Sequence, residues 1–293
     1  MPEVSRSLAL LWTGVLGGCA DVVVETDIPY DERFAVAKLD VYSPPPRAAA
    51  RPAVIVIHGG GWREDSDRDY MGEHSERFAQ AGYVAFNIEY RGTPGDGAFP
   101  GAVQDTICAL SFVRANAARW NVDPDRIASY GYSAGGHLAS MLGVAATAPV
   151  VAPDCASGPT GPVAAVVSGA GPQDMRLFPE ADALIDFLGG GKDDAPETWT
   201  NASPIHHVTP GAPPFLFITG DDDWFVDIEH AESMQRALAG VGTEGRMFVI
   251  PGGGHLFNRS PSGQTWDVTL SLDTPEAWAA TIDFLDRTIG GDL

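Results

Sequence analysis

The most constraining feature of the chain is one serine held between two glycines, in the sequence GYSAG at residues 131–135. Ser133 follows a short strand-like run, and residues 136–142 can form a helix that begins just after it. A serine on such a tight strand-to-helix turn sits in a strained backbone conformation, so Gly131 and Gly135 must be nearly free of side chain. The pattern predicts a nucleophile elbow; the alternative is a glycine-rich turn with an incidental serine.

A glycine triplet follows another apolar run, in the sequence HGGGW at residues 58–62. Glycines at the end of a strand leave backbone N–H groups free to point into a cleft, as they do in oxyanion-hole loops. We expect the N–H groups of Gly60 and Gly61, together with that of Ala134 after the serine, to hold an oxyanion. His58 is expected to brace this loop by hydrogen bonding and to take no direct part in the chemistry.

A histidine that could accept the serine proton ends a second glycine-rich loop, PGGGH at residues 251–255. His255 is the last of the seven histidines and follows a strand-like run. It would act as general base toward Ser133 and later return the proton to the leaving group. His74, by contrast, is expected on a surface helix beside two glutamates.

Four aspartates compete to be the acid that orients this base. Asp221, Asp222, Asp223 and Asp227 all follow the strand-like run at 215–219. A carboxylate in that place would fix the tautomer of the histidine and stabilise the imidazolium. An acidic loop is more often simply solvated, and spacing alone does not separate the four.

Strand-like and helical stretches alternate along the chain. This alternation predicts an α/β fold with a mainly parallel sheet and helices on both faces. A chain of 293 residues suits one such domain, and we expect residues 36–293 to form a single catalytic domain. The main strand-like runs are residues 36–42, 54–57, 83–88, 127–130, 163–168, 215–219 and 247–250.

Several motifs follow one another in order: residues 58–62, Tyr90-Arg91, residues 131–135, Ser203-Pro204, Gly220-x-x-Asp223-x-x-Val226 and Gly254-His255-x-Phe257. Together they resemble the α/β-hydrolase esterase/lipase family, closest to its small bacterial feruloyl- and acetyl-esterase-like branch. In that pattern the acid stands three residues after the glycine and three before the valine, which selects Asp223. Asp174, after the preceding strand, is the fallback.

The resemblance implies the α/β-hydrolase fold and a serine carboxylic-ester hydrolase that works through an acyl-enzyme. The implied substrates are short-chain acyl esters or sugar-linked acetyl and feruloyl esters. Few residues precede the glycine loop, so we expect no large cap domain. Residues 176–204 would form either a wall of the substrate pocket or an ordinary crossover. The alternatives are an amidase that resembles kynurenine formamidase and a lipid-anchored binding protein without turnover.

The N-terminus carries an expected export signal. Residues 8–16 form an apolar run that suits a signal-peptide core and is too short to span a bilayer. The run ends in Leu16-Gly17-Gly18-Cys19, which resembles a bacterial lipobox. The resemblance implies removal of residues 1–18 and lipidation of Cys19, which would anchor an exported protein to a membrane on its periplasmic or cell-surface side.

Residues 19–35 would then form a tether and N-terminal segment. The acidic residues between 20 and 30 argue against an ordered role for that stretch. We expect the lipid on Cys19 to be the only contact with a membrane.

Charge and ligand patterns exclude several other classes of function. The net charge is −21 without a basic patch, which argues against nucleic-acid binding and favours neutral or cationic substrates. Neither His206-His207 nor the acidic loop has the ligand spacing of a zinc or calcium site, so we expect no metal and no cofactor. Cys108 and Cys155 would form either a disulfide or two buried thiols.

Overall fold

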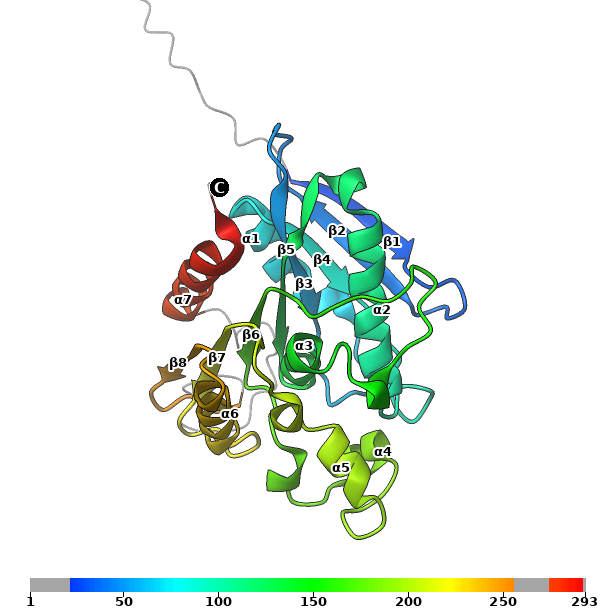
Figure 1. Ribbon diagram of the computed structural model, residues 1–293, viewed down its shortest axis with the longest axis vertical. Coiled ribbons are helices and arrows are strands. Elements are labelled where there is room, and N and C mark those ends of the chain that lie inside the picture. Colours follow the sequence, from blue (N-terminus) through cyan, green and yellow to red (C-terminus); the bar gives the residue numbers. More distant parts are fainter. Residues whose placement is uncertain (1–21, 256–273, 292–293) are drawn as a thin grey trace, which may run out of the picture.

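The computed structural model describes residues 22–255 and 274–291, and its centre is one 8-stranded sheet (Figure 1). The strand order is β1-β2-β4-β3-β5-β6-β7-β8. The β1–β2 and β2–β4 pairs are antiparallel, and every pair from β4 to β8 is parallel. The strands are β1 (Val23–Pro29), β2 (Lys38–Ser43), β3 (Arg51–Ile57), β4 (Val84–Ile88), β5 (Val122–Tyr132), β6 (Ala165–Gly169), β7 (Phe215–Gly220) and β8 (Gly245–Ile250).

Helices cover both faces of this sheet. The side chains of α2, α3 and α6 pack with Ile55 and Phe86 on one face, whereas α1 and α7 pack with Val54 and Tyr130 on the other. This is the mainly parallel α/β arrangement that the alternation of strands and helices predicts, and it fits the α/β-hydrolase fold that the family resemblance implies. The helices are α1 (Gly72–Gln80), α2 (Gly101–Ala115), α3 (Ala134–Val144), α4 (Asp182–Leu188), α5 (Pro196–Asn201), α6 (Glu229–Gly240) and α7 (Pro275–Leu285).

The expected tether between residues 20 and 30 requires a correction. Strand β1 occupies most of it and pairs with β2 through Val24–Tyr42 and Ile28–Leu39. The acidic side chains of β1 do not oppose this, because Glu25 pairs with Arg119 and Asp27 pairs with Arg68. Residues 1–18 and Cys19 lie outside the described residues.

A disulfide joins Cys108 on α2 to Cys155 in the loop before β6, with the two Cα atoms 5.1 Å apart. The bridge closes a separation of 47 residues and thereby ties this long loop to the helix layer. Sequence alone left the pair open between a bridge and two thiols. Within residues 22–255 and 274–291, no helix is both long and apolar enough to cross a bilayer.

Candidate active site

The nucleophile elbow lies at the end of the central strand β5. Ser133 has φ 53° and ψ −120°, and helix α3 begins at the next residue. A Cβ on Gly135 would lie 2.1 Å from the carbonyl oxygen of Ile57, and one on Gly131 would lie 2.2 Å from the carbonyl oxygen of Gly135. Since these oxygen atoms belong to the backbone of β3 and of α3, only glycine fits at both positions. The strained backbone conformation of Ser133 is therefore fixed by the backbone atoms that pack closely against Gly131 and Gly135.

Three side chains form one hydrogen-bonded line at the carboxyl ends of β5, β7 and β8. His255 Nε2 lies 3.0 Å from Ser133 Oγ, and His255 Nδ1 lies 2.9 Å from Asp223 Oδ2. Because the carboxylate only accepts, Nδ1 carries the proton and Nε2 is free to accept the serine hydroxyl. The structure thus brings together the serine, base and acid that the motifs select.

Asp223 differs from the other candidate acids in burial and in partners. Its side chain is fully buried, while Asp221, Asp222 and Asp227 are exposed. Its second oxygen, Oδ1, accepts the backbone N–H groups of Phe225 at 2.9 Å and Val226 at 2.8 Å. Every oxygen of the carboxylate is therefore assigned, one to the loop and the other to His255.

The fallback acid lies in a different set of contacts. Asp174 pairs with Arg176 at 2.7 Å, and this guanidinium, together with hydrogen bonds from it, keeps the pKa of the carboxyl below its usual value although burial acts to raise it. Both oxygens of Asp174 receive hydrogen bonds from Arg176. This carboxylate is not directed at His255.

The glycine loop after β3 presents free backbone donors next to the elbow. Gly60 and Gly61 have φ of 99° and 62°, which turn the chain away from the strand. In the part of the chain that the structure describes, the N–H groups of Gly60, Gly61 and Ala134 donate to no protein acceptor. These are the donors that the sequence assigns to an oxyanion, and they remain available to a ligand.

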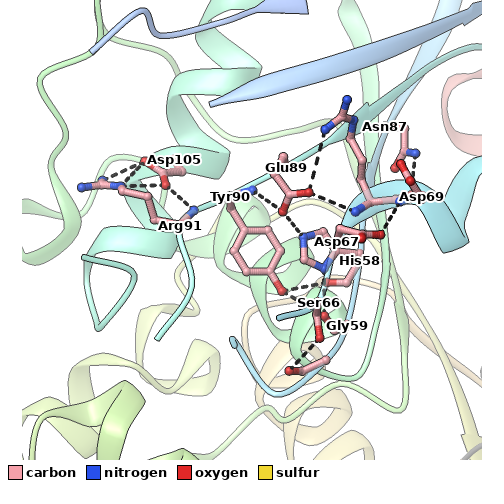
Figure 2. Close-up of polar contacts among 12 residues, drawn as sticks. His58, Gly59, Ser66, Asp67, Asp69, Asn87, Glu89, Tyr90, Arg91 and Asp105 are labelled. Carbon is pink, nitrogen blue, oxygen red and sulfur yellow. Dashed lines mark hydrogen bonds and ion pairs between the residues drawn. The ribbon is translucent and has the colours of Figure 1, made fainter. Parts of the chain in front are cut away.

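A buried polar network supports this loop (Figure 2). His58 is fully buried, with Nε2 2.7 Å from Glu89 Oε1 and Nδ1 2.9 Å from the carbonyl oxygen of Gly59. Its ring stacks on Tyr90 at 4.1 Å between centroids, and the Tyr90 hydroxyl donates to the carbonyls of His58 and Gly59. The backbone N–H of Arg68 donates to Glu89 Oε2 at 3.1 Å. His58 thus braces the loop, as expected.

A second support joins the glycine loop to the elbow helix. Trp62 Nε1 donates to His137 Nδ1 at 3.1 Å, and His137 Nε2 donates to the carbonyl of Ala202 at 2.8 Å. Complete burial lowers the pKa of His137 to about 3, so this histidine is neutral and can both accept and donate. Phe187 of α4 stacks on Trp62 at 4.5 Å between centroids. Phe187 and Ala202, both within residues 176–204, therefore support the glycine loop through Trp62 and His137.

Sequence reasoning missed most of these supports. Glu89 and His137 carry no local motif for their roles, because each role depends on a partner 31 or more residues away. His74 was expected at the surface, but its side chain is buried, and neither ring nitrogen has a hydrogen-bond partner among the described residues. Burial lowers the pKa of His74 to about 4. The two glutamates beside it suggested exposure, but helix α1 turns the histidine toward the sheet.

Phe257, the last residue of the histidine motif, lies outside the described residues. Among the described residues, no group of three or more His, Cys, Asp or Glu side chains could hold a metal ion.

Fold and site together define an α/β-hydrolase with a Ser-His-Asp constellation and an adjacent glycine loop. Comparison with known families is consistent with that class. The chain belongs to the BD-FAE family, whose profile matches residues 39–238.

Individual relatives agree with the family assignment. The chain is 33% identical over 222 residues to esterase LipC of Mycobacterium tuberculosis. The aligned region covers 73% of this chain and 55% of LipC. It is 28% identical over 210 residues to an acetylxylan esterase of Xylanibacter ruminicola, covering 70% of this chain and 41% of that enzyme. The chain therefore spans only about half the length of these relatives.

A solved structure shares the fold over nearly the whole chain. A truncated carbohydrate esterase from gut microbiota superposes with a TM-score of 0.79 at 24% identity, covering 92% of this chain and 98% of the other. The sheet and its helices are therefore arranged as in that enzyme.

Proposed function

We propose that the protein is a carboxylic-ester hydrolase that works through an acyl-enzyme on Ser133. The observation that carries this proposal is the unbroken hydrogen-bond line from Asp223 through His255 to Ser133. In the first step Ser133 Oγ attacks the ester carbonyl while His255 Nε2 takes its proton. His255 then gives that proton to the leaving alcohol, and water repeats the sequence to release the acid.

The negative charge that develops on the carbonyl oxygen would be held by the N–H groups of Gly60, Gly61 and Ala134. Backbone donors fixed in advance stabilise such a charge without reorganisation, and each is worth about 3 to 4 kcal/mol. Two buried hydrogen bonds favour this role because they restrict movement of the glycine loop. They join His58 to Glu89 and Trp62 to His137.

We further propose that the acyl group is short, or is an acetyl or feruloyl group displayed on a sugar. Ser133 is half-buried and so is reached from solvent. Helices α4 and α5 are 7 and 6 residues long, too short to form a large cap over the site. The similarity to a protein named acetylxylan esterase points in the same direction.

Turnover of a series of alkyl and sugar esters beside an N-formyl amide tests this function. We expect kcat/KM to be highest for about two to four acyl carbons, because an open site binds few methylenes of a longer chain. Faster turnover of the N-formyl amide than of every ester would instead favour the formamidase-like alternative. Binding of esters without any turnover would favour the non-catalytic binding protein.

We also propose that the protein is exported and anchored by a lipid on Cys19. The support is the sequence Leu16-Gly17-Gly18-Cys19 after an apolar run. Expression of the full chain in a bacterial host and partition into detergent tests the anchor, with Cys19→Ser as the variant. We expect the wild type in the detergent phase and the variant in the aqueous phase; the same partition for both would contradict it.

A further inference from the structure

The loop that carries the acid also carries two exposed aromatic side chains. Trp224 is 78% exposed and Phe225 is 46% exposed, and both follow Asp223 directly. Leu177, on the neighbouring turn after β6, is a third exposed apolar side chain. Large aromatic side chains at the surface are costly to leave in water and often mark a binding site.

These aromatic rings are held in place by the same contacts that orient the acid. The carboxylate of Asp223 accepts the N–H groups of Phe225 and Val226, so the loop wraps around the buried carboxylate. Val226 turns inward and is buried, whereas the two residues before it turn outward. The exposure of the pair is thus built into the geometry of the acid loop.

Phe225 lies directly beside the reacting histidine. Its ring centroid is 5.0 Å from that of His255 and 6.0 Å from that of the buried Phe178. Trp224 meets the edge of Phe225 at 5.7 Å, with the two rings 72° apart. Phe225 is therefore anchored on both sides, and the indole of Trp224 remains open to a ligand.

The position of this pair decides which part of an ester it can contact. A general base that becomes a general acid must reach the oxygen of the leaving alcohol, so the alcohol part of the ester lies on the histidine side. Phe225 borders that side through its contact with His255. The acyl part is placed instead by the oxyanion donors of the glycine loop.

The charges around the pair favour an uncharged ligand with hydroxyl groups. Asp221, Asp222 and Asp227 are exposed on the same loop. Carboxylates accept hydrogen bonds from hydroxyls and repel anions. A sugar ring meets both requirements, because its C–H face can lie on an indole while its hydroxyls donate to carboxylates.

We propose that Trp224 and Phe225 form the subsite for the alcohol part of the ester and that this part is an uncharged pyranose. The inference rests on the esterase function proposed above. Trp224 and Phe225 would determine which leaving alcohol is preferred, whereas Ser133 and the glycine loop would act on every ester.

The test compares Trp224→Ala with wild type on acetylated xylo-oligosaccharide and on ethyl acetate. Stacking on an aromatic ring is worth about 3- to 10-fold in affinity. We expect the fall in kcat/KM to be larger by that factor for the sugar ester than for ethyl acetate, mainly through KM. Trp224→Phe should recover most of the loss. The control Val150→Ala truncates another exposed apolar side chain, far from the acid loop in sequence. It should leave kcat/KM unchanged for both esters.

Titration calorimetry with unesterified xylo-oligosaccharide separates this inference from the esterase function. Weaker binding by Trp224→Ala than by wild type supports the subsite, whether or not esters are turned over. Equal binding, or equal losses on both esters, would overturn it. With p-nitrophenyl acetate assayed as a third ester, a loss confined to that ester would show an aryl subsite and would also overturn the pyranose. An absence of ester turnover by wild type, with sugar binding intact, would reject the proposed hydrolysis alone.

Discussion

The two halves of the site are held in different ways. Ser133 stands at the end of β5, inside the sheet between β3 and β6, where backbone atoms pack too closely for any Cβ on Gly131 or Gly135. Asp223 and His255 stand on loops after β7 and β8, and β8 is one of the two edge strands of the sheet. The residues of β8 are mostly half-buried, and only Ile250 is fully buried.

The two halves are sensitive to different kinds of substitution. The nucleophile half depends on main-chain shape, so it should fail when a side chain is added. The acid–base half depends on the hydrogen bonds that one buried carboxylate accepts, so it should fail when an oxygen of that carboxylate is removed or neutralised.

The largest effect is expected from Asp223→Asn. An amide in place of the carboxylate favours the wrong histidine tautomer and lowers kcat by about 10⁴-fold. Ester turnover measures this, together with a urea titration to show that the fold persists. The control Asp222→Asn changes an exposed neighbour and should leave kcat nearly unaltered. A larger loss from Asp174→Asn than from Asp223→Asn would show that the acid has been misassigned.

Removal of the disulfide should alter stability and not chemistry. Cys108 and Cys155 close a separation of 47 residues, and loss of such a cross-link lowers the free energy of unfolding by about 4 kcal/mol. The double variant Cys108→Ala/Cys155→Ala in urea unfolding checks this. Neither cysteine contacts the triad, so kcat below the unfolding transition should stay at the wild-type value. A lower kcat in the folded variant would mean that the bridge also shapes the site.

Gly135→Ala probes the nucleophile half directly. The added methyl would lie 2.1 Å from the carbonyl oxygen of Ile57 and 2.4 Å from that of His58. Neither backbone atom can move freely, so we expect a loss of about 3 kcal/mol in stability and a large loss of turnover. Gly240→Ala, at the end of α6, meets no atom within 4 Å and is the matched control. Equal stability of the two variants would refute the close-packed elbow.

The smallest effect concerns pH and a position outside both halves. Burial lowers the pKa of His74 to about 4, below its ordinary 6.5. The unfolded chain therefore takes up a proton that the folded chain resists, and stability is lost as the pH falls from 6.5 toward 4, by about 3 kcal/mol at most. His74→Leu should reduce this loss because leucine does not titrate. The replacement breaks no hydrogen bond of the ring within residues 22–255 and 274–291. Equal acid sensitivity of variant and wild type in urea titrations at pH 7 and 4.5 would contradict it.

The nucleophile half could be predicted from sequence because its constraints are local. The steric needs of Ser133 act on residues two positions away, and the glycines that satisfy them are visible in the sequence. The acid could not be chosen by spacing, since four aspartates share one loop. The family pattern selected Asp223, and only the tertiary structure shows its two N–H donors and its contact with His255.

The remaining differences have the same cause. Strand β1 is held by backbone pairing to β2, which leaves no apolar side-chain pattern to detect. The contact of His58 with Glu89 and the bridge from Cys108 to Cys155 join residues 31 and 47 positions apart. No local periodicity encodes such distances, whereas the sheet and its helices follow from alternation that extends along the whole chain.

The most direct test of the acyl-enzyme is intact-mass spectrometry after reaction with a short-chain alkyl phosphonate ester. Such a reagent stays bound to an activated serine and marks the nucleophile. We predict one adduct per chain, located on Ser133 by peptide mapping, and neither adduct nor ester turnover in Ser133→Ala. An adduct on another residue, or undiminished turnover by a folded Ser133→Ala variant, would contradict the assignment of Ser133 as nucleophile.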